Sequence, residues 1–154
     1  VLGLDSYSEV YITNAVKCSL SHEKKPKALE VSICKRTWFD KELLFIDQIC
    51  PTLPILMCGK IAYELTKLLI PDLKKSKKSL NSIRGKILYY KEHPIVCTIN
   101  PAAIAKSELW LERNKVSTKG YINSYLALPP FSISPIKIYE RDIAIIKPLL
   151  RHET

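Results

Sequence analysis

"PILMCGKIAYELTKLL", residues 54–69, decides the class of the fold. Its first part, 54–59, is a short apolar run that suits a strand buried on both faces. Gly59 ends that run, and glycine tolerates the backbone of a tight turn. An amphipathic stretch, 60–69, follows and stops before Pro71. The segment predicts a buried strand that turns directly into a helix, the alternation found in α/β proteins.

The same alternation extends on both sides of this segment. Further strand-like runs lie at 10–16, 86–90 and 95–100. Further helical stretches lie at 26–48, at 102–115 and at 140–152, where Pro148 bends or breaks the helix. We therefore predict an α/β fold with three layers, α/β/α, around a mostly parallel central sheet of about four strands. In the longest helical stretch one amphipathic stripe is formed by Leu29, Ile33, Leu43 and Leu44.

Length and composition indicate one domain over residues 1–154. The chain has 154 residues, of which 47% are hydrophobic, and this is enough to bury a core. Two stretches without clear periodicity, a basic one at 71–85 and a proline-containing one at 117–135, are predicted to be loop insertions. No apolar run is long enough to cross a bilayer, so we expect no membrane partner.

The charge and the cysteines suggest a partner and a compartment. A net charge of +9 favours nucleic acid as a partner, although a lysine-rich chain can also be merely soluble. Five cysteines form no tight framework, which indicates a reduced, cytoplasmic protein. We expect Cys50, Cys58 and Cys97 to be core residues.

Polar residues follow two of the predicted strands. Asn14 ends the first strand, and Asn100 with Pro101 follows the last. Ligands of α/β sheets bind beyond the carboxyl ends of the strands, so this edge is the expected site. Asparagine is also common simply where a strand turns, which is the alternative reading of Asn14.

The ordered blocks "VYITNAVKC", "PILMCGKIAYELTKLL", "SIRGKI" and "VCTINPAAIAK" resemble the uracil-DNA glycosylase superfamily. The closest resemblance is to its iron–sulfur branch, family 4, and covers roughly residues 8–114. Cys18 and Cys34 are 16 residues apart, like the last two cluster cysteines of that branch. The resemblance implies that they are two of four thiolate ligands of a 4Fe-4S cluster. The other two ligands, and the family's first motif, would precede Val1, so we expect an N-terminally truncated chain.

The resemblance also implies roles for the two asparagines. Asn14 would read uracil by accepting a hydrogen bond from N3–H and donating one to O4, a pattern that cytosine reverses. Asn100 stands where the family has a histidine that donates to the uracil O2 as the glycosidic bond breaks. A neutral amide still donates, but it stabilises negative charge less well. Another branch of the superfamily has asparagine at this position.

DNA contacts are implied for four more residues. Pro101 and Ile104 belong to the loop that enters the minor groove, with Ile104 as the wedge that replaces the extruded base. Lys106 would contact phosphate. Arg84 is either a phosphate contact or structural. Ile104 fits a helix core equally well, and His93 is read as a turn residue.

Three hypotheses follow. The first is a monomeric DNA repair enzyme that flips uracil, or a related deaminated base, out of single- or double-stranded DNA and hydrolyses its N-glycosidic bond. The second is a catalytically impaired module of the same fold that binds nucleic acid. The third is an unrelated α/β domain, such as a small-molecule enzyme.

Overall fold

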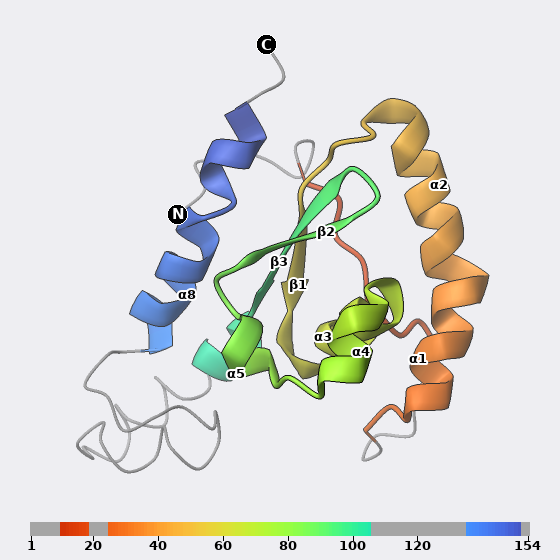
Figure 1. Cartoon of the computed structure of the whole chain (residues 1–154), viewed down its shortest axis with the longest axis horizontal. Coiled ribbons are helices and arrows are strands. Elements are labelled where there is room, and N and C mark those ends of the chain that lie inside the picture. The colour runs from red at the N-terminus through yellow and green to blue at the C-terminus, as the bar shows by residue number, and fades with distance from the viewer. Residues whose placement is uncertain (1–9, 19–24, 106–134, 152–154) are drawn as a thin grey trace.

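The structure, a computed structural model, describes residues 10–18, 25–105 and 135–151. Its centre is a mixed sheet of three strands, β1 (Ile55–Cys58), β2 (Ile87–Tyr90) and β3 (His93–Thr98). β3 lies in the middle, parallel to β1 and antiparallel to β2. β2 and β3 therefore form a hairpin, whereas the chain passes from β1 through the helices α3, α4 and α5 before it reaches that hairpin (Figure 1).

Helices cover both faces of this sheet. The α-helices are α1 (Ala28–Cys34), α2 (Asp40–Ile49), α3 (Gly59–Leu69), α4 (Pro71–Ser76), α5 (Leu80–Ile83) and α8 (Pro135–Ala144). A π-helical turn, η1 (Lys35–Phe39), joins α1 to α2, and a 3-10 helix, η2 (Lys147–Arg151), follows α8. Figure 1 shows α8 on one side of the sheet and α1 with α2 on the other.

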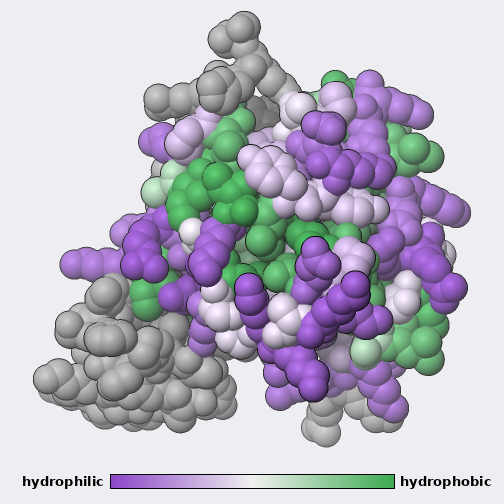
Figure 2. Space-filling model, viewed as in Figure 1, coloured by the Kyte–Doolittle hydropathy of each residue, from purple (hydrophilic) through white to green (hydrophobic). Residues whose placement is uncertain are grey.

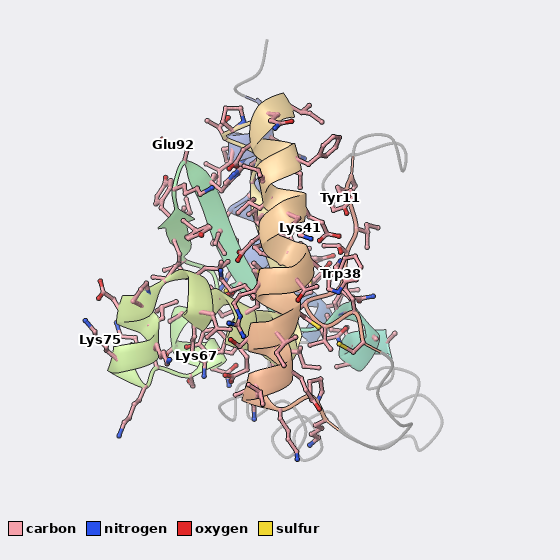
Figure 3. All side chains as sticks on the ribbon, turned by 90° about the vertical axis from the view of Figure 1, so that its right-hand side faces the viewer. Tyr11, Trp38, Lys41, Lys67, Lys75 and Glu92 are labelled. Carbon is pink, nitrogen blue, oxygen red and sulfur yellow. The ribbon has the colours of Figure 1, made fainter. Side chains whose placement is uncertain are left out.

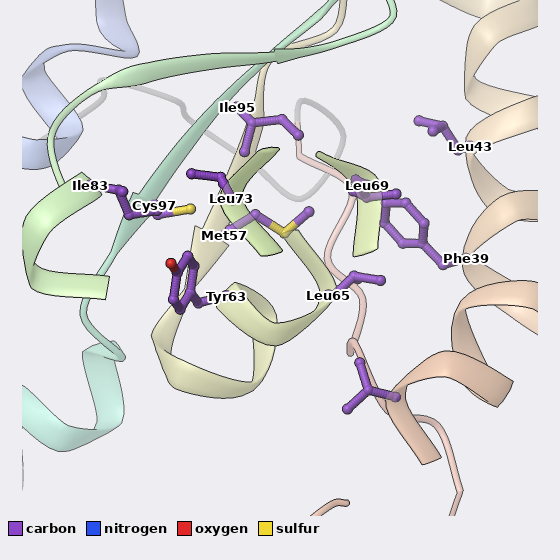
Figure 4. Packing of buried hydrophobic residues seen from close by; sticks show 11 residues of the cluster. Phe39, Leu43, Met57, Tyr63, Leu65, Leu69, Leu73, Ile83, Ile95 and Cys97 are labelled. Atoms are coloured by element: carbon purple, nitrogen blue, oxygen red, sulfur yellow. The ribbon is translucent and has the colours of Figure 1, made fainter. Parts of the chain in front are cut away.

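The two faces of β3 have different partners. Ile95 and Cys97 belong to the main core, which α3 completes with side chains such as Leu65 (Figure 4). Successive side chains of a strand point to opposite faces, so Val96 and Thr98 face the other layer. Thr98 there donates a hydrogen bond to Asp142 of α8. The predicted three-layer α/β/α arrangement is confirmed around this strand.

The sheet is smaller than the sequence predicts. The run at 10–16 is not a strand: residues 10–18 are irregular, and only their Ala15 and Val16 pack against the core. Among the described residues the sheet therefore has three strands instead of about four, and it is only partly parallel. Strand-prone residues alone do not form a strand where no ladder of backbone hydrogen bonds is available.

Two helical predictions need correction. The basic stretch 71–85 is not a loop, because it contains α4 and α5. Helix formation over 26–48 is confirmed in broad outline, but the predicted stripe is not the buried face. Of that stripe only Leu43 is buried, whereas Leu29, Ile33 and Leu44 are exposed. The π turn shifts the phase of the helix, so the buried positions are instead Val31, Cys34, Phe39 and Leu43.

His93 is a strand residue and not a turn residue. It is fully buried at the start of β3. Its Nε2 lies 2.5 Å from Asp47 Oδ1, and its Nδ1 lies 2.9 Å from the carbonyl oxygen of Leu53, so both ring nitrogens have a polar partner. Within the described residues, no helix is both long enough and apolar enough to cross a membrane.

Candidate active site at the carboxyl edge of the sheet

The carboxyl ends of the two parallel strands bring Gly59 and Asn100 together. Cys58, the last residue of β1, pairs in register with Thr98, the last residue of β3. Gly59 then turns into α3 with a φ of +87°. A Cβ atom placed on Gly59 would lie 2.9 Å from the Cβ atom of Asn100. Glycine is needed here both for its backbone angle and for this close approach.

Asn100 is the cap of the helical turn that follows it. Its side-chain Oδ1 accepts a hydrogen bond from the backbone N–H of Ala102 at 2.9 Å, and its carbonyl oxygen accepts from Ala103. This is the geometry of a helix N-cap. Because an N–H donor must face an oxygen, the capping bond fixes the orientation of the carboxamide. Within the described residues the amino group has no hydrogen-bond partner, and the side chain is exposed at the sheet edge.

Asn14 lies on a segment that side chains hold against α2. Glu42 of α2 accepts hydrogen bonds from Tyr11 at 3.0 Å and from Thr13 at 3.3 Å. Its carboxylate also pairs with Lys17 at 2.7 Å. These contacts flank the exposed Asn14 on both sides, and Figure 3 shows Tyr11 beside the helix. The Glu42 carboxylate therefore supports this segment in place of the backbone hydrogen bonds that a strand would have.

Cys18 and Cys34 anchor the same segment a second time. Their sulfur atoms are 3.1 Å apart, and both are free thiols. A hydrogen bond from Cys18, followed by the backbone N–H of Lys17, lowers the pKa of Cys34, whereas the same thiol contact raises the pKa of Cys18. Cys34 is thus the sulfur that carries negative charge more readily.

This pair fits one half of a four-thiolate site. The contact between Cys18 and Cys34 is consistent with the prediction that both are ligands of one cluster, which remains a prediction. In the part of the chain that the structure describes, no group of three or more His, Cys, Asp or Glu residues gathers around a common point. Of the remaining cysteines, Cys97 is buried and burial raises its pKa to about 11, while Cys50 and Cys58 are half-buried.

Arg84 is engaged inside the protein. Its Nε lies 3.2 Å from Oδ2 of Asp142, a fully buried carboxylate on α8. Only a tenth of the Arg84 side chain is exposed. Burial lowers the pKa of Arg84 and raises that of Asp142, so for both groups desolvation outweighs the partner's charge. The geometry favours the structural reading of Arg84 over a phosphate contact.

The remaining predicted DNA contacts have different surroundings. Pro101 is exposed next to Asn100. Ile104 is only 5% exposed, which favours the helix core over a wedge. Lys106 lies outside the described residues. Exposed lysines instead gather on the α4–α5 region, where Figure 2 shows hydrophilic side chains; they are Lys74, Lys75, Lys77 and Lys78.

Comparison with known proteins identifies the family. Residues 3–123 match the family described as the uracil DNA glycosylase superfamily. The chain belongs to this superfamily. A type-4 uracil-DNA glycosylase of Sulfurisphaera tokodaii is 32% identical to it over 107 residues, 67% of this chain and 44% of the relative. The chain thus spans less than half the length of that glycosylase, and the hypothesis of an unrelated α/β domain is wrong.

Sequence reasoning missed two residues that support the segments of the candidate site. Glu42 holds the Asn14 segment, and Asp142 holds the end of β3. Glu42 had no detectable signal, because a glutamate on an amphipathic helix is usually just solvated. For Asp142 the sequence holds a weak signal of burial, since this aspartate is followed directly by the apolar run 143–146.

Proposed function

We propose that this protein is a DNA glycosylase that flips uracil, or a related deaminated base, out of DNA and hydrolyses its N-glycosidic bond. Family membership supports the reaction class. The observation that carries the proposal is the fixed carboxamide of Asn100, whose oxygen caps a helix while its amino group stays free at the carboxyl edge of the sheet.

Asn100 acts as the donor to the leaving base. As the bond between C1′ and N1 breaks, its electron pair moves onto the base, and negative charge grows on O2. Water supplies the hydroxyl group to C1′, and its remaining proton ends on the base or in solvent. A donor that is already oriented stabilises that charge without reorganising. The Ala102 N–H helps indirectly, because it prevents the carboxamide from presenting its oxygen.

Asn14 is the reader of the base. Its oxygen accepts from N3–H of uracil, and its amino group donates to O4. Cytosine has an acceptor at N3 and a donor at N4, so the same amide in the same orientation rejects it. The Glu42 contacts and the Cys18–Cys34 contact restrict the segment on either side of Asn14, which favours a fixed orientation.

DNA binds at the same edge through Pro101, Lys106 and the lysines of the α4–α5 region. Lys78 lies against α3, since its carbonyl oxygen accepts a hydrogen bond from Tyr63 of that helix. The positive charge supplies sequence-independent affinity for phosphates. Since the substrate is DNA and the thiols are free, we place the protein inside the cell as a monomeric, single-domain enzyme.

Cys18 and Cys34 would hold one side of a 4Fe-4S cluster, as in the family-4 branch. The cluster would supply a cross-link between the Asn14 segment and α1. The contact of the two thiols, and the lowered pKa of Cys34, suit thiolate ligation. Two thiolates are half of the four that such a cluster usually has.

Uracil release under single-turnover conditions tests the proposal. The informative variant is Asn100→Asp, because aspartate caps a helix as well as asparagine but has no donor for O2. We expect the release rate to fall by roughly 10²–10³-fold at unchanged melting temperature. Asn100→His, which restores the family residue, is expected to raise the rate. The proposal fails if the wild-type protein releases no uracil, or if Asn100→Asp releases it as fast.

The second candidate is a binding module that does not cut. The neutral amide at position 100, in place of an imidazole, is the observation that favours it. A module of this kind would bind uracil-containing DNA with an affinity that falls steeply with salt, and neither wild type nor Asn100→His would release the base.

A further inference from the structure

Asp142 of α8 is the most deeply buried acidic side chain among the described residues. It is fully inaccessible to solvent and reaches three parts of the chain. Thr98 donates to its Oδ2 at 3.0 Å, and Arg84 Nε lies 3.2 Å from the same oxygen. A Cβ atom on Gly85 would come within 3.0 Å of its Oδ1, so the backbone closes over the carboxylate.

This arrangement is not an efficient source of stability. Asp142 Oδ1 and Arg84 Nε and Nη1 are buried without a hydrogen-bond partner in the described part of the chain. Removing two charges from water is unfavourable unless good hydrogen bonds compensate for the lost hydration. The raised pKa of Asp142 and the lowered pKa of Arg84 have the same cause. In some proteins a buried polar group that costs stability serves to fix one particular geometry.

The geometry that it fixes is the end of β3. Thr98 is the last residue of that strand, two residues before Asn100. Gly85, next to Arg84, donates its N–H to the carbonyl oxygen of Cys97 at 3.4 Å. Asp142 therefore links α8 to the final residues of β3 by one direct contact, through Thr98, and by one indirect contact, through Arg84 and Gly85.

We propose that Asp142 is a positioning residue: through Thr98 it holds the end of β3 so that Asn100 keeps its capping bond and presents its amino group to the base. The inference rests on the proposed function for its effect on catalysis. Its effect on the position of Asn100 does not depend on that function.

Thr98→Val is the test variant, because valine has the shape of threonine without the hydroxyl donor. Thr98→Ser retains the donor and serves as the conservative rescue. Thr66→Val is the matched control, since Thr66 is equally buried and its hydroxyl donates to Ala62 and lies 3.6 Å from the sulfur of Cys97 on the other face of the sheet. This control therefore removes a hydroxyl contact to β3 that does not involve Asp142. Both valine variants lose one buried hydroxyl group, but only one of them loses a contact with Asp142.

Hydrogen exchange of the Ala102 amide measures the position of Asn100 directly, because that N–H is held by the Asn100 oxygen. We expect exchange to accelerate about tenfold in Thr98→Val, in line with the loss of one hydrogen bond. Thr98→Ser and Thr66→Val should exchange at the wild-type rate. Equal acceleration in both valine variants, or in neither, overturns the inference.

Uracil release separates this inference from the proposed function. We expect Thr98→Val to lower the single-turnover rate about tenfold with DNA affinity unchanged, since misplacing one donor affects the transition state more than binding. A wild-type protein without activity would end the proposed function, yet the exchange comparison would still decide the role of Asp142. Asp142→Asn should act like Thr98→Val; if it fails to fold, the Thr98 variants give the answer.

Discussion

The segments that carry Asn14 and Asn100 are held in place by different means. Asn100 follows a buried, backbone-paired strand, caps a helical turn and has a buried polar support beneath it. Asn14 lies on an irregular segment, held by the partly exposed Glu42 and by a contact between two thiols. The exposed Asn100 is supported from below by a buried strand and a buried carboxylate, whereas the Asn14 segment depends on contacts that salt, pH and the state of the cysteines can alter.

The largest expected effect concerns the buried support of Asn100. Arg84→Met removes the partner of Asp142 and leaves an uncompensated buried carboxylate. We expect a loss of about 3 kcal/mol in the free energy of unfolding at pH 8, the size typical of a broken buried pair. Chemical denaturation measures it, and Arg84→Met combined with Asp142→Leu should recover most of the loss because no charge then remains buried.

The loss of stability in Arg84→Met should depend on pH, because it comes from the ionised form of Asp142. Burial already raises the folded-state pKa of Asp142 above its usual 3.8, and removing Arg84 raises it further. A raised folded-state pKa means that the stability is present below pH 3.8 and is lost as pH rises through the folded-state value. The penalty should therefore be smaller at pH 5 than at pH 8. A penalty that is the same at both pH values would contradict the buried ionised state of Asp142.

The next largest loss of stability is expected for Gly59→Ala. The added methyl group meets Asn100 Cβ at 2.9 Å, and the φ of +87° strains any residue other than glycine. We expect a destabilisation of roughly 1–3 kcal/mol by thermal or chemical unfolding. Because the methyl group touches Asn100 itself, Asn100→Gly should relieve part of the cost. Purely additive effects in the double-mutant cycle would show that the two residues do not touch.

A smaller effect is expected from Glu42→Gln, which removes the charge that supports the Asn14 segment. Lys17 and Glu42 are each about a fifth exposed, so their ion pair contributes below about 1 kcal/mol. We expect faster amide exchange over residues 11–18 at low salt and a smaller difference from wild type at high salt. Glu64→Gln, which breaks the Glu64–Lys67 pair on α3, is the matched control and should leave this segment unchanged.

The smallest effect tests the connection between the two regions. Asp47 of α2 bonds Lys91 and His93, so it joins the helix that supports Asn14 to the strand that leads to Asn100. The Lys91 contact, followed by His93, lowers the pKa of Asp47 below 3.8. Its stabilisation is therefore present above pH 3.8 and is lost as pH falls through the folded-state value. Asp47→Asn should flatten the fall in melting temperature below about pH 4; an unchanged slope would count against the connection.

The sequence predicted the Asn100 region better than the Asn14 region, for a physical reason. The strand, glycine and helix at 54–69 and the strand before Asn100 follow from local apolar patterning, which matches their buried environment. The irregular form of 10–18 depends on Glu42 and Cys34, contacts between residues far apart in sequence that no local pattern encodes. The π turn at 35–39 and the burial of His93 escaped prediction for the same reason, since tertiary contacts override local preference.

The central claim is that Asn14 and Asn100, although supported so differently, bind one uracil together. Titration of the 15N-labelled protein with free uracil, followed through the side-chain NH2 signals of the asparagines, tests it most directly. We predict that the signals of Asn14 and Asn100 shift with the same dissociation constant, and that cytosine at equal concentration shifts neither. Signals that respond equally to cytosine, or a shift at only one of the two asparagines, would contradict the shared site.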